Sequence, residues 1–261
     1  MKRLELANPL EAFRLEGEVA VITGGASGIG RAAAIAMARL GARIAILDRN
    51  QEGGIAVASE IARFGGTAEA HALDVVDEEA VNRSMAAIHG LHGRLDILVN
   101  SAGIARRLPA IDLPLPDWER VIAVNVTGSF LCARAAARYM LGKDGRIVNI
   151  ASIMGYSGGL FPNVSYQTSK GAVVNMTRTL AVEWAKQGIR VNGVAPTFIH
   201  TPLTKTILSQ PETRAKIEDA TPMGVIGEVE DVVGAVIFLS CRASSLITGE
   251  TIAVDGGFLA Q

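Results

Sequence analysis

The chain has 261 residues, of which 49% are hydrophobic and 20% are charged, so an intrinsically disordered chain is excluded. Its 25 basic and 26 acidic residues give a net charge of −1 and form no basic patch along the sequence, which argues against a nucleic-acid-binding protein. No segment is long and apolar enough for a membrane span, and residues 1–17 lack the apolar core of a signal peptide.

Short β-branched runs alternate with longer Ala-rich or amphipathic segments along the chain. The predicted strands are Val19–Thr23, Arg43–Leu47, Thr67–Leu73, Leu95–Asn100, Arg146–Ala151, Arg190–Ala195 and Thr251–Val254. The predicted helices are Gly30–Leu40, Gly54–Phe64, Glu78–Leu91, Trp118–Met140, Ser169–Lys186 and Val229–Cys241. Such alternation is typical of βαβ units, whose right-handed crossovers place helices on both faces of a parallel sheet. We therefore predict an α/β fold, a Rossmann-type doubly wound sheet of seven parallel strands.

No linker, charge run or repeat interrupts the alternation, so residues 1–261 are predicted to form a single domain, with residues 1–14 as an N-terminal extension. Two proline-containing segments interrupt the alternation of strands and helices, Arg106–Asp117 and Pro196–Met223. Both follow the carboxyl ends of predicted strands, where ligands bind in open α/β sheets. We predict that residues 197–223 form a substrate lid.

A glycine-rich turn, Gly24-Gly-Ala-Ser-Gly28-Ile-Gly30, joins the first predicted strand to a helix. Such a turn can be purely structural. In this strand–turn–helix context, however, it lets backbone amides approach a pyrophosphate and directs the helix N-terminus at that charge. The sequence therefore predicts a dinucleotide site at the start of the chain. The residues assigned to it are Gly24, Ser27, Gly28, Ile29 and Gly30.

The second predicted strand is followed by an acidic residue, Asp48. A carboxylate there can hydrogen-bond the ribose hydroxyls of NAD, and it repels the 2′-phosphate of NADP. Ser27, inside the turn, carries no positive charge, whereas Arg49 could accept a phosphate. We predict NAD as the preferred cofactor and NADP as the less favoured one.

Ordered motifs continue along the chain. They are Asp74-Val75, Asn100-Ser-Ala-Gly103, Asn125, Ser152, Tyr166-Gln-Thr-Ser-Lys170, Pro196-Thr-Phe-Ile-His-Thr201 and Val254-Asp-Gly-Gly257. With these motifs the chain from about Leu15 to Gln261 resembles the short-chain dehydrogenase/reductase family. The resemblance implies the strand order 3-2-1-4-5-6-7. Two positions depart from the family pattern: Ser101 replaces an asparagine, and Thr197 stands where glycine is usual, which leaves the backbone after Pro196 as a question for the structure.

The resemblance implies roles for individual residues. The implied catalytic residues are Asn125, Ser152, Tyr166 and Lys170. The implied cofactor contacts, beyond the turn and Asp48, are Asp74, Val75, Asn100, Ala102, Gly103, Tyr166, Lys170, Pro196, Ile199 and Thr201. In the family, the asparagine helps to hold a water beneath the lysine and so completes a proton relay to solvent.

The residue chemistry agrees with these roles. A free tyrosine has a pKa near 10, too high for a base at neutral pH. Tyr166 and Lys170 are spaced i, i+4 and share a face of a helix, so we expect the ammonium to lower the pKa of the phenol. Ser152, at the end of a predicted strand, can hold the substrate oxygen that Tyr166 protonates or deprotonates.

A second pair with the same spacing, Tyr139 and Lys143, tests this interpretation. It lies at the end of a predicted helix, just before a strand. That position is at the amino-terminal edge of the sheet, opposite the crevice in which a dinucleotide binds. We therefore expect Tyr139 to have no catalytic role.

The substrate is defined less sharply. Arg106 and Arg107 follow Gly103 closely, and an arginine there can bind a carboxylate through two hydrogen bonds; a solvated pair of charges is the alternative. In such a fold His200, Asn163 and Thr204 also face the pocket. The residues assigned to the substrate are Ser152, Arg106, Tyr166 and His200.

Within the family, the stretch after Ala102-Gly103 resembles sugar-acid and sugar-alcohol dehydrogenases. We predict an oxidoreductase that transfers a hydride between NAD(H) and a secondary alcohol or ketone, namely a sugar alcohol or sugar acid. A reductase of a 3-oxoacyl thioester or another bulky ketone is the alternative. A third hypothesis, a non-catalytic NAD-sensing scaffold, is disfavoured by the intact Asn–Ser–Tyr–Lys set.

The remaining expectations concern assembly and location. The helices predicted over Ser169–Lys186 and Val229–Cys241 are apolar on more than one face, and relatives use them as tetramer contacts, so we expect a homotetramer. Cys132 and Cys241 cannot form a disulfide framework, which fits a reducing cytoplasm. In some relatives a terminal glutamine, here Gln261, helps to bind Mg²⁺, but we predict no metal site.

Overall fold

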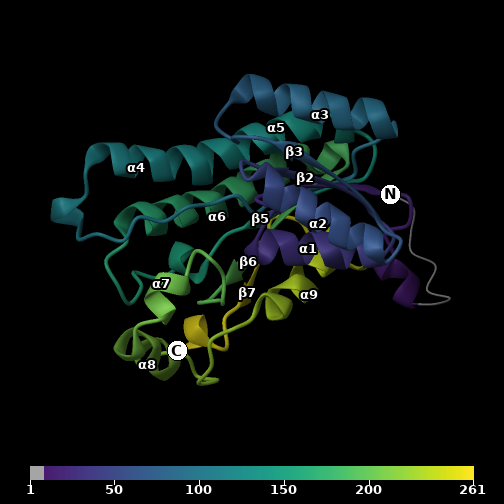
Figure 1. Cartoon of the computed structure of the whole chain (residues 1–261). Helices are drawn as coiled ribbons and strands as arrows, with labels where there is room; N and C mark the ends of the chain where they lie inside the picture. The colour runs from purple at the N-terminus through teal and green to yellow at the C-terminus, as the bar shows by residue number, and fades with distance from the viewer. Residues whose placement is uncertain (1–8) are drawn as a thin grey trace.

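The computed structural model describes residues 9–261, in which seven strands form a sheet of order β3-β2-β1-β4-β5-β6-β7 (Figure 1). Every neighbouring pair of strands is parallel. The predicted order is therefore confirmed. The strands are β1 (Val19–Thr23), β2 (Arg43–Asp48), β3 (Thr67–Ala72), β4 (Ile97–Asn100), β5 (Gly145–Ile150), β6 (Ile189–Pro196) and β7 (Thr251–Val254). Residues 1–8 of the predicted N-terminal extension lie outside the described residues.

Helices cover both faces of the sheet (Figure 1). One face packs against α1 (Gly28–Arg39), α2 (Gln51–Arg63) and α9 (Val229–Ser240). The other packs against α3 (Glu78–His92), α5 (Ser129–Met140) and α6 (Val164–Trp184). The doubly wound architecture follows from these two layers.

The alternation of side chains in β1 explains why two separate cores form. Val19 and Val21 belong to the core on the α3–α5–α6 side, whereas Ala20 and Ile22 belong to the core on the α1–α2–α9 side. Successive residues of a strand point to opposite faces, so a strand covered on both sides is apolar throughout. Complete burial of one such aliphatic side chain stabilises the fold by about 1.5–3 kcal/mol.

The helix predicted over Trp118–Met140 is interrupted in the structure. Helix α4 (Leu115–Ile122) is followed by a π-helical turn, η3 (Ala123–Gly128), which leads into α5. Its wider turn includes Asn125. Single π-helical turns inside α-helices often occur at functional sites, because the extra residue redirects a side chain.

The long segment after β6 forms two short helices, α7 (Lys205–Leu208) and α8 (Pro211–Asp219), beside the C-terminus (Figure 1). The amide Nε2 of Gln261 donates a 2.8 Å hydrogen bond to the carbonyl of Ala220, just after α8. The remaining short helices are η1 (Pro9–Phe13), η2 (Ala110–Asp112), η4 (Ile153–Gly155), η5 (Ala185–Gln187), η6 (Arg242–Ser244) and η7 (Phe258–Ala260). Within residues 9–261, no helix has the length and apolar composition to cross a bilayer.

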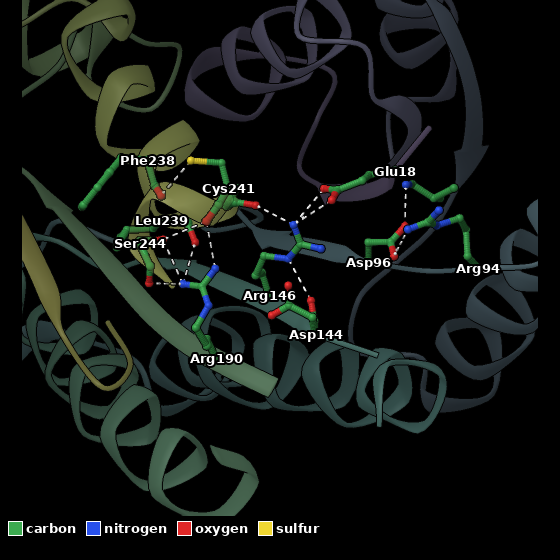
Figure 2. A network of polar contacts seen from close by, with 12 residues as sticks. Glu18, Arg94, Asp96, Asp144, Arg146, Arg190, Phe238, Leu239, Cys241 and Ser244 are labelled. Atoms are coloured by element: carbon green, nitrogen blue, oxygen red, sulfur yellow. Dashed lines mark hydrogen bonds and ion pairs between the residues drawn. The ribbon is translucent and has the colours of Figure 1, made fainter. Parts of the chain in front are cut away.

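A buried polar network lies at the amino-terminal edge of the sheet (Figure 2). The Arg146 guanidinium, only 3% exposed, donates to both carboxylate oxygens of Glu18, at 3.0 and 2.8 Å. It also donates to the carbonyl of Ser240 at 3.4 Å. Arg190 donates to the carbonyls of Cys241 and Ser244, at 3.0 and 2.8 Å. Two strand arginines therefore satisfy carbonyls at and beyond the C-terminus of α9, where the helix itself has no basic residue.

Candidate active site

A cleft of about 310 Å³ runs along the carboxyl ends of the strands from β1 to β6. This is the edge at which open α/β sheets bind ligands. It gathers residues that lie far apart in the sequence and includes most of the predicted cofactor contacts. Those that line it are Gly24, Ser27, Gly28, Ile29, Asp48, Asp74, Val75, Ala102, Gly103, Tyr166, Lys170, Pro196, Ile199 and Thr201.

The glycine turn forms one wall of the cleft. Gly24 and Gly28 have positive φ angles of 66° and 53°, which side chains other than glycine rarely adopt. A Cβ on Gly28 would lie 3.4 Å from Thr201 Cγ2 across the cleft, and one on Gly30 would lie 2.3 Å from the Gly24 carbonyl oxygen. Gly30 therefore serves close packing of α1 against the turn and does not line the cleft.

The first turn of α1 is open to the cleft. Its N-cap, Ser27, makes no side-chain capping hydrogen bond, so the first amides of the helix keep their donors available. Amide donors and the helix dipole together make a site for anionic phosphate. This donor set fits the pyrophosphate of a nicotinamide dinucleotide.

Two carboxylates and two arginines mark the end of the cleft near β2. Asp48 accepts hydrogen bonds from the amides of Ala26 and Asn50, at 3.1 and 2.9 Å. Asp74 lies 3.1 Å from an Arg120 nitrogen and 4.0 Å from one of Arg49.

Partial burial raises the pKa of Asp74, but the hydrogen bonds from Arg120 and from the Val76 amide outweigh that effect and hold it below its usual value. Both Asp74 and Asp48 line the cleft, so this end carries carboxylates beside the cations.

The two predicted asparagines have supporting positions. Asn100 lies outside the cleft lining, and its Nδ2 donates to the Ser129 carbonyl and to Asn149 Oδ1, at 3.1 and 3.0 Å. Asn125 binds both the amide and the carbonyl of Ile104, each at 2.9 Å, and also donates to Ser169 Oγ. The π-helical turn thereby aims Asn125 at the loop that follows β4.

Ser152, Tyr166 and Lys170 meet at one wall of the cleft. Ser152 follows β5, and its Oγ accepts a 3.1 Å hydrogen bond from the Met154 amide. Tyr166 and Lys170 lie one turn apart in α6. The Lys170 Nζ donates a 2.6 Å hydrogen bond to the Ile150 carbonyl and lies 5.5 Å from the centre of the Tyr166 ring.

The charges around Tyr166 differ from the sequence expectation. Burial raises the pKa of the Tyr166 phenol, and the effects that oppose burial are a hydrogen bond with Ser152 and the positive charge of Arg107. Lys170, expected to lower this pKa, is held by the Ile150 carbonyl, and its own pKa falls to about 8 because it is buried. Ser152 and Arg107 therefore oppose the effect of burial on the phenol without overcoming it, and its pKa stays above the ordinary value.

A second, smaller cavity continues from Tyr166 and Ser152 toward the segment after β6. Arg107 and Asn163 line it together with apolar side chains. Its other lining residues are Ile153, Met154, Phe161, Gln167, Thr197, Phe198, Leu203 and Thr204. Its position next to Ser152 and Tyr166 makes it the candidate substrate pocket.

The structure does not bring two of the predicted substrate residues to this cavity. The Arg106 Nε forms a 2.8 Å ion pair with Asp117 Oδ2 on the surface, because α4 begins just below it. The Nε2 of His200 lies 3.9 Å from Glu228 Oε1, outside both cavities. Arg107 takes the place that the sequence assigned to Arg106, since neighbouring residues of an extended loop face opposite ways.

Sequence reasoning missed the apolar walls of the substrate cavity. Phe161 and Phe198 meet edge to face with ring centres 6.3 Å apart, and Leu203 lines both cavities. The available signal was their position: Phe161 lies between Ser152 and Tyr166, and Phe198 lies inside the motif that begins at Pro196.

A doubly wound parallel sheet with a phosphate-binding turn and a Ser–Tyr–Lys group at its carboxyl edge defines a nicotinamide-dependent oxidoreductase. The comparison with known sequences agrees, and the chain belongs to the short-chain dehydrogenase/reductase family. A family model described as enoyl-(acyl carrier protein) reductase matches residues 24–259.

Relatives of different specificity are equally similar to this chain. The D-threitol dehydrogenase of Mycolicibacterium smegmatis is 40% identical over 247 residues, which cover 94% of this chain and 94% of that protein. The 3-oxoacyl-(acyl-carrier-protein) reductase of Aquifex aeolicus is also 40% identical over 247 residues, which cover 94% and 98% of the two chains.

Solved structures match over almost the whole chain. A short-chain type dehydrogenase/reductase from Mycobacterium marinum has a TM-score of 0.94 and 38% identity, covering 97% of this chain and 100% of that chain. A gluconate 5-dehydrogenase from Burkholderia cenocepacia, in complex with NADP and tartrate, has a TM-score of 0.93 and 35% identity, with 97% and 100% covered.

Proposed function

We propose that this chain is an NAD-linked dehydrogenase that oxidises a secondary hydroxyl of a sugar acid. The observation that carries the proposal is Arg107, a half-buried cation in the wall of the substrate cavity. Its side chain donates one 3.2 Å hydrogen bond, to the Leu203 carbonyl, and among residues 9–261 no carboxylate pairs with it. A partly desolvated guanidinium is matched best by a carboxylate, which binds it through two hydrogen bonds.

The catalytic roles follow from the positions around the cleft. Ser152 holds the carbinol oxygen, and the Tyr166 phenolate takes its proton. NAD held in the cleft would supply the acceptor for the hydride that leaves the carbinol carbon. Lys170 remains a charged donor beside the phenol below its pKa of about 8, and Asn125 keeps the adjoining loop closed around the site.

Relatives support more than one substrate class. A sugar alcohol has no carboxylate that could bind Arg107. A 3-oxoacyl thioester also has none close to its reacting carbonyl. The thioester reductase stays the alternative, because one relative named for that activity is 40% identical. The cation in the substrate cavity favours the sugar acid over both.

Replacing Arg107 with methionine tests the proposal. We expect the pH-independent kcat/KM for gluconate, taken on the high-pH plateau, to fall by about 10–100-fold, the usual loss for a charge-assisted contact, while the plateau value for threitol changes little. The positive charge of Arg107 lowers the pKa of Tyr166, so its removal raises that pKa. The pH profile of oxidation is therefore expected to move to higher pH with both substrates.

The matched control is Arg106→Met, because Arg106 lies next in sequence and pairs with Asp117 on the surface. Steady-state rates of NADH formation, measured across pH, separate the two variants. Equal loss with gluconate and threitol in Arg107→Met would leave no case for a carboxylate site.

We further propose NAD as the preferred cofactor. Asp48 supports it, because this carboxylate lines the adenosine end of the cleft and repels a 2′-phosphate. Arg49 is the opposing feature, and the Burkholderia relative was crystallised with NADP. Arg49 lies 4.0 Å from Asp74, whose lowered pKa keeps it charged, so the cation is partly neutralised within the chain.

The cofactor proposal predicts that wild-type enzyme uses NAD at least about tenfold better than NADP. Asp48→Asn removes the charge and keeps an acceptor oxygen for one of the two amides, those of Ala26 and Asn50, that the carboxylate binds. It is expected to lose most of that preference. Arg49→Met is the control and is expected to weaken NADP use further. Equal kcat/KM for the two cofactors in wild-type enzyme would contradict the proposal.

We also propose a homotetramer, a substrate lid formed by residues 197–223, and a cytoplasmic location. The assembly prediction rests on α6 and α9. Val182 on α6 is 83% exposed, which supports burial of that helix face in a homotetramer, a state that sedimentation equilibrium tests. Residues 197–223 contribute Phe198 and Leu203 to the substrate cavity, which supports their role as a lid. The two free cysteines, both buried, support a cytoplasmic location.

A further inference from the structure

Two residues in the wall of the substrate cavity each carry a polar atom that has no hydrogen-bond partner within residues 9–261. These atoms are the Oδ1 of Asn163 and the Oγ1 of Thr197, and both atoms are buried. Most buried polar groups in native proteins are paired, so two orphaned atoms on residues that line one cavity require an explanation. A ligand that supplies the missing partners is the simplest one.

The side chain of Asn163 does not cap the helix that begins beside it. Asn163 is the N-cap residue of α6, where an asparagine side chain normally accepts a hydrogen bond from an amide of the first turn. Its side chain makes no such bond, although the residue is only 8% exposed. The first turn is held by the Asn163 carbonyl alone, which accepts from the Gln167 amide at 3.0 Å. The side-chain amide is thus available to the cavity.

Thr197 is the residue that stands where the family has glycine. Its amide donates a 3.0 Å hydrogen bond to the Val254 carbonyl, which extends the pairing of β6 with β7. Within residues 9–261, Asp144 is the non-glycine residue with positive φ, so the backbone at position 197 does not require glycine. The threonine therefore adds a hydroxyl to the cavity without strain.

A second threonine in the wall of the cavity, Thr204, is fully hydrogen-bonded within the chain. Thr204 also lines the cavity, but its Oγ1 donates to the Ile199 carbonyl and accepts from the Thr201 amide at 3.1 Å. Its hydrogen-bonding capacity is used within the chain. Asn163 Oδ1 and Thr197 Oγ1 differ from it, because neither has a hydrogen-bond partner among residues 9–261.

We propose that Asn163 and Thr197 form a neutral subsite that binds a hydroxyl of the substrate other than the one oxidised. The Asn163 oxygen accepts the hydroxyl proton, and the Thr197 hydroxyl can donate or accept. The subsite rests on the proposed function, since it selects polyhydroxylated substrates over those with a plain carbon chain. This subsite binds hydroxyl groups of the substrate, whereas Arg107 binds its carboxylate.

Two pairs of four-carbon probes test the subsite. Tartrate and succinate differ only in two hydroxyls, and so do threitol and butane-1,4-diol. Binding to the NADH-loaded enzyme is measured by calorimetry. We expect wild-type enzyme to favour the hydroxylated member of at least one pair by about tenfold, because its absence leaves buried polar groups unpaired.

Thr197→Val and Asn163→Leu keep the size of each side chain and remove the polar atoms. Each is expected to lower the hydroxyl preference by about fivefold or more. Asn163→Leu is expected to leave NADH affinity unchanged, because Asn163 lines the substrate cavity and not the cofactor cleft, whereas Thr197 lines both. Because the deleted groups have no partner in the free protein, its melting temperature is expected to hold or rise. A purely structural role would lower it. Thr206→Val, at an exposed threonine of the same segment, is the control.

The outcomes separate the two proposals. The subsite is overturned if wild-type enzyme shows no hydroxyl preference in either pair, or if the preference survives in both variants. The sugar-acid function is overturned separately if Arg107→Met leaves the affinities for tartrate and succinate unchanged. Loss of the preference for threitol in Thr197→Val supports the subsite even in that case.

Discussion

Tyr166→Phe is expected to reduce turnover by about 10²–10⁴-fold, the usual contribution of a positioned acid–base group, and to leave no measurable oxidation. The phenyl ring keeps the packing of the half-buried tyrosine, but no oxygen remains to take the carbinol proton. Binding of NAD is expected to persist, because the glycine turn and the Asp48 end of the cleft are untouched. NADH formation and a separate NAD titration measure the two effects.

Tyr139→Phe is the matched control, since Tyr139 and Lys143 repeat the spacing of Tyr166 and Lys170. Tyr139 lies in the last turn of α5, with its ring stacked on His89 at 4.6 Å between ring centres. It lines neither cavity. We expect kcat to remain near the wild-type value. If Tyr139→Phe abolished activity and Tyr166→Phe did not, the assignment of the active site would be wrong.

Arg146→Met is expected to lower the free energy of unfolding at pH 7 by about 3–5 kcal/mol, because it leaves a buried carboxylate without its partner. Burial already raises the pKa of Glu18, and Arg146 is the main influence that lowers it. Without the arginine the folded-state pKa rises further above the ordinary value of 4.5.

The sign of the pH dependence follows from that shift. Below pH 4.5, Glu18 is protonated in the folded and unfolded states, so the variant loses least there. As the pH rises through the raised folded-state pKa, the unfolded state releases its proton more readily, and the stability of the variant falls. Urea unfolding at several pH values, at one fixed protein concentration, measures this trend.

Two further variants define the cause. Glu18→Gln combined with Arg146→Met removes both charges and is expected to recover part of the lost stability at pH 7. Arg242→Met replaces an exposed arginine close to the network and is expected to change stability by less than about 0.5 kcal/mol. A loss in Arg146→Met that is the same at pH 4 and pH 8 would exclude the unpaired carboxylate as its cause.

The sequence by itself determined the order of the strands and helices. It also singled out the glycine turn and the Tyr166–Lys170 pair as candidate site residues. Strand and helix periodicities are local, because each depends on which face of one element is buried. The turn at Gly24–Gly30 and the i, i+4 pair Tyr166 and Lys170 are local in the same sense. The seven-stranded parallel sheet was therefore predicted correctly, and most of the predicted site residues lie together at its carboxyl edge.

The tertiary structure decided which way individual side chains face. Arg106 and Arg107 are adjacent and chemically alike, and only the position of Asp117 and the wall around Tyr166 directs the first outward and the second inward. The π-helical turn at Asn125 likewise appears as a plain helix in the residue pattern.

The electrostatics were also decided by residues distant in the sequence. The pKa of Tyr166 depends on its burial, on Ser152 and on Arg107, none of which follows from the spacing to Lys170. The C-terminus of α9 has no basic residue of its own and receives Arg146 and Arg190 from two strands. Burial and charge act through space, so a one-dimensional pattern names the groups but does not fix the distances that set their strength.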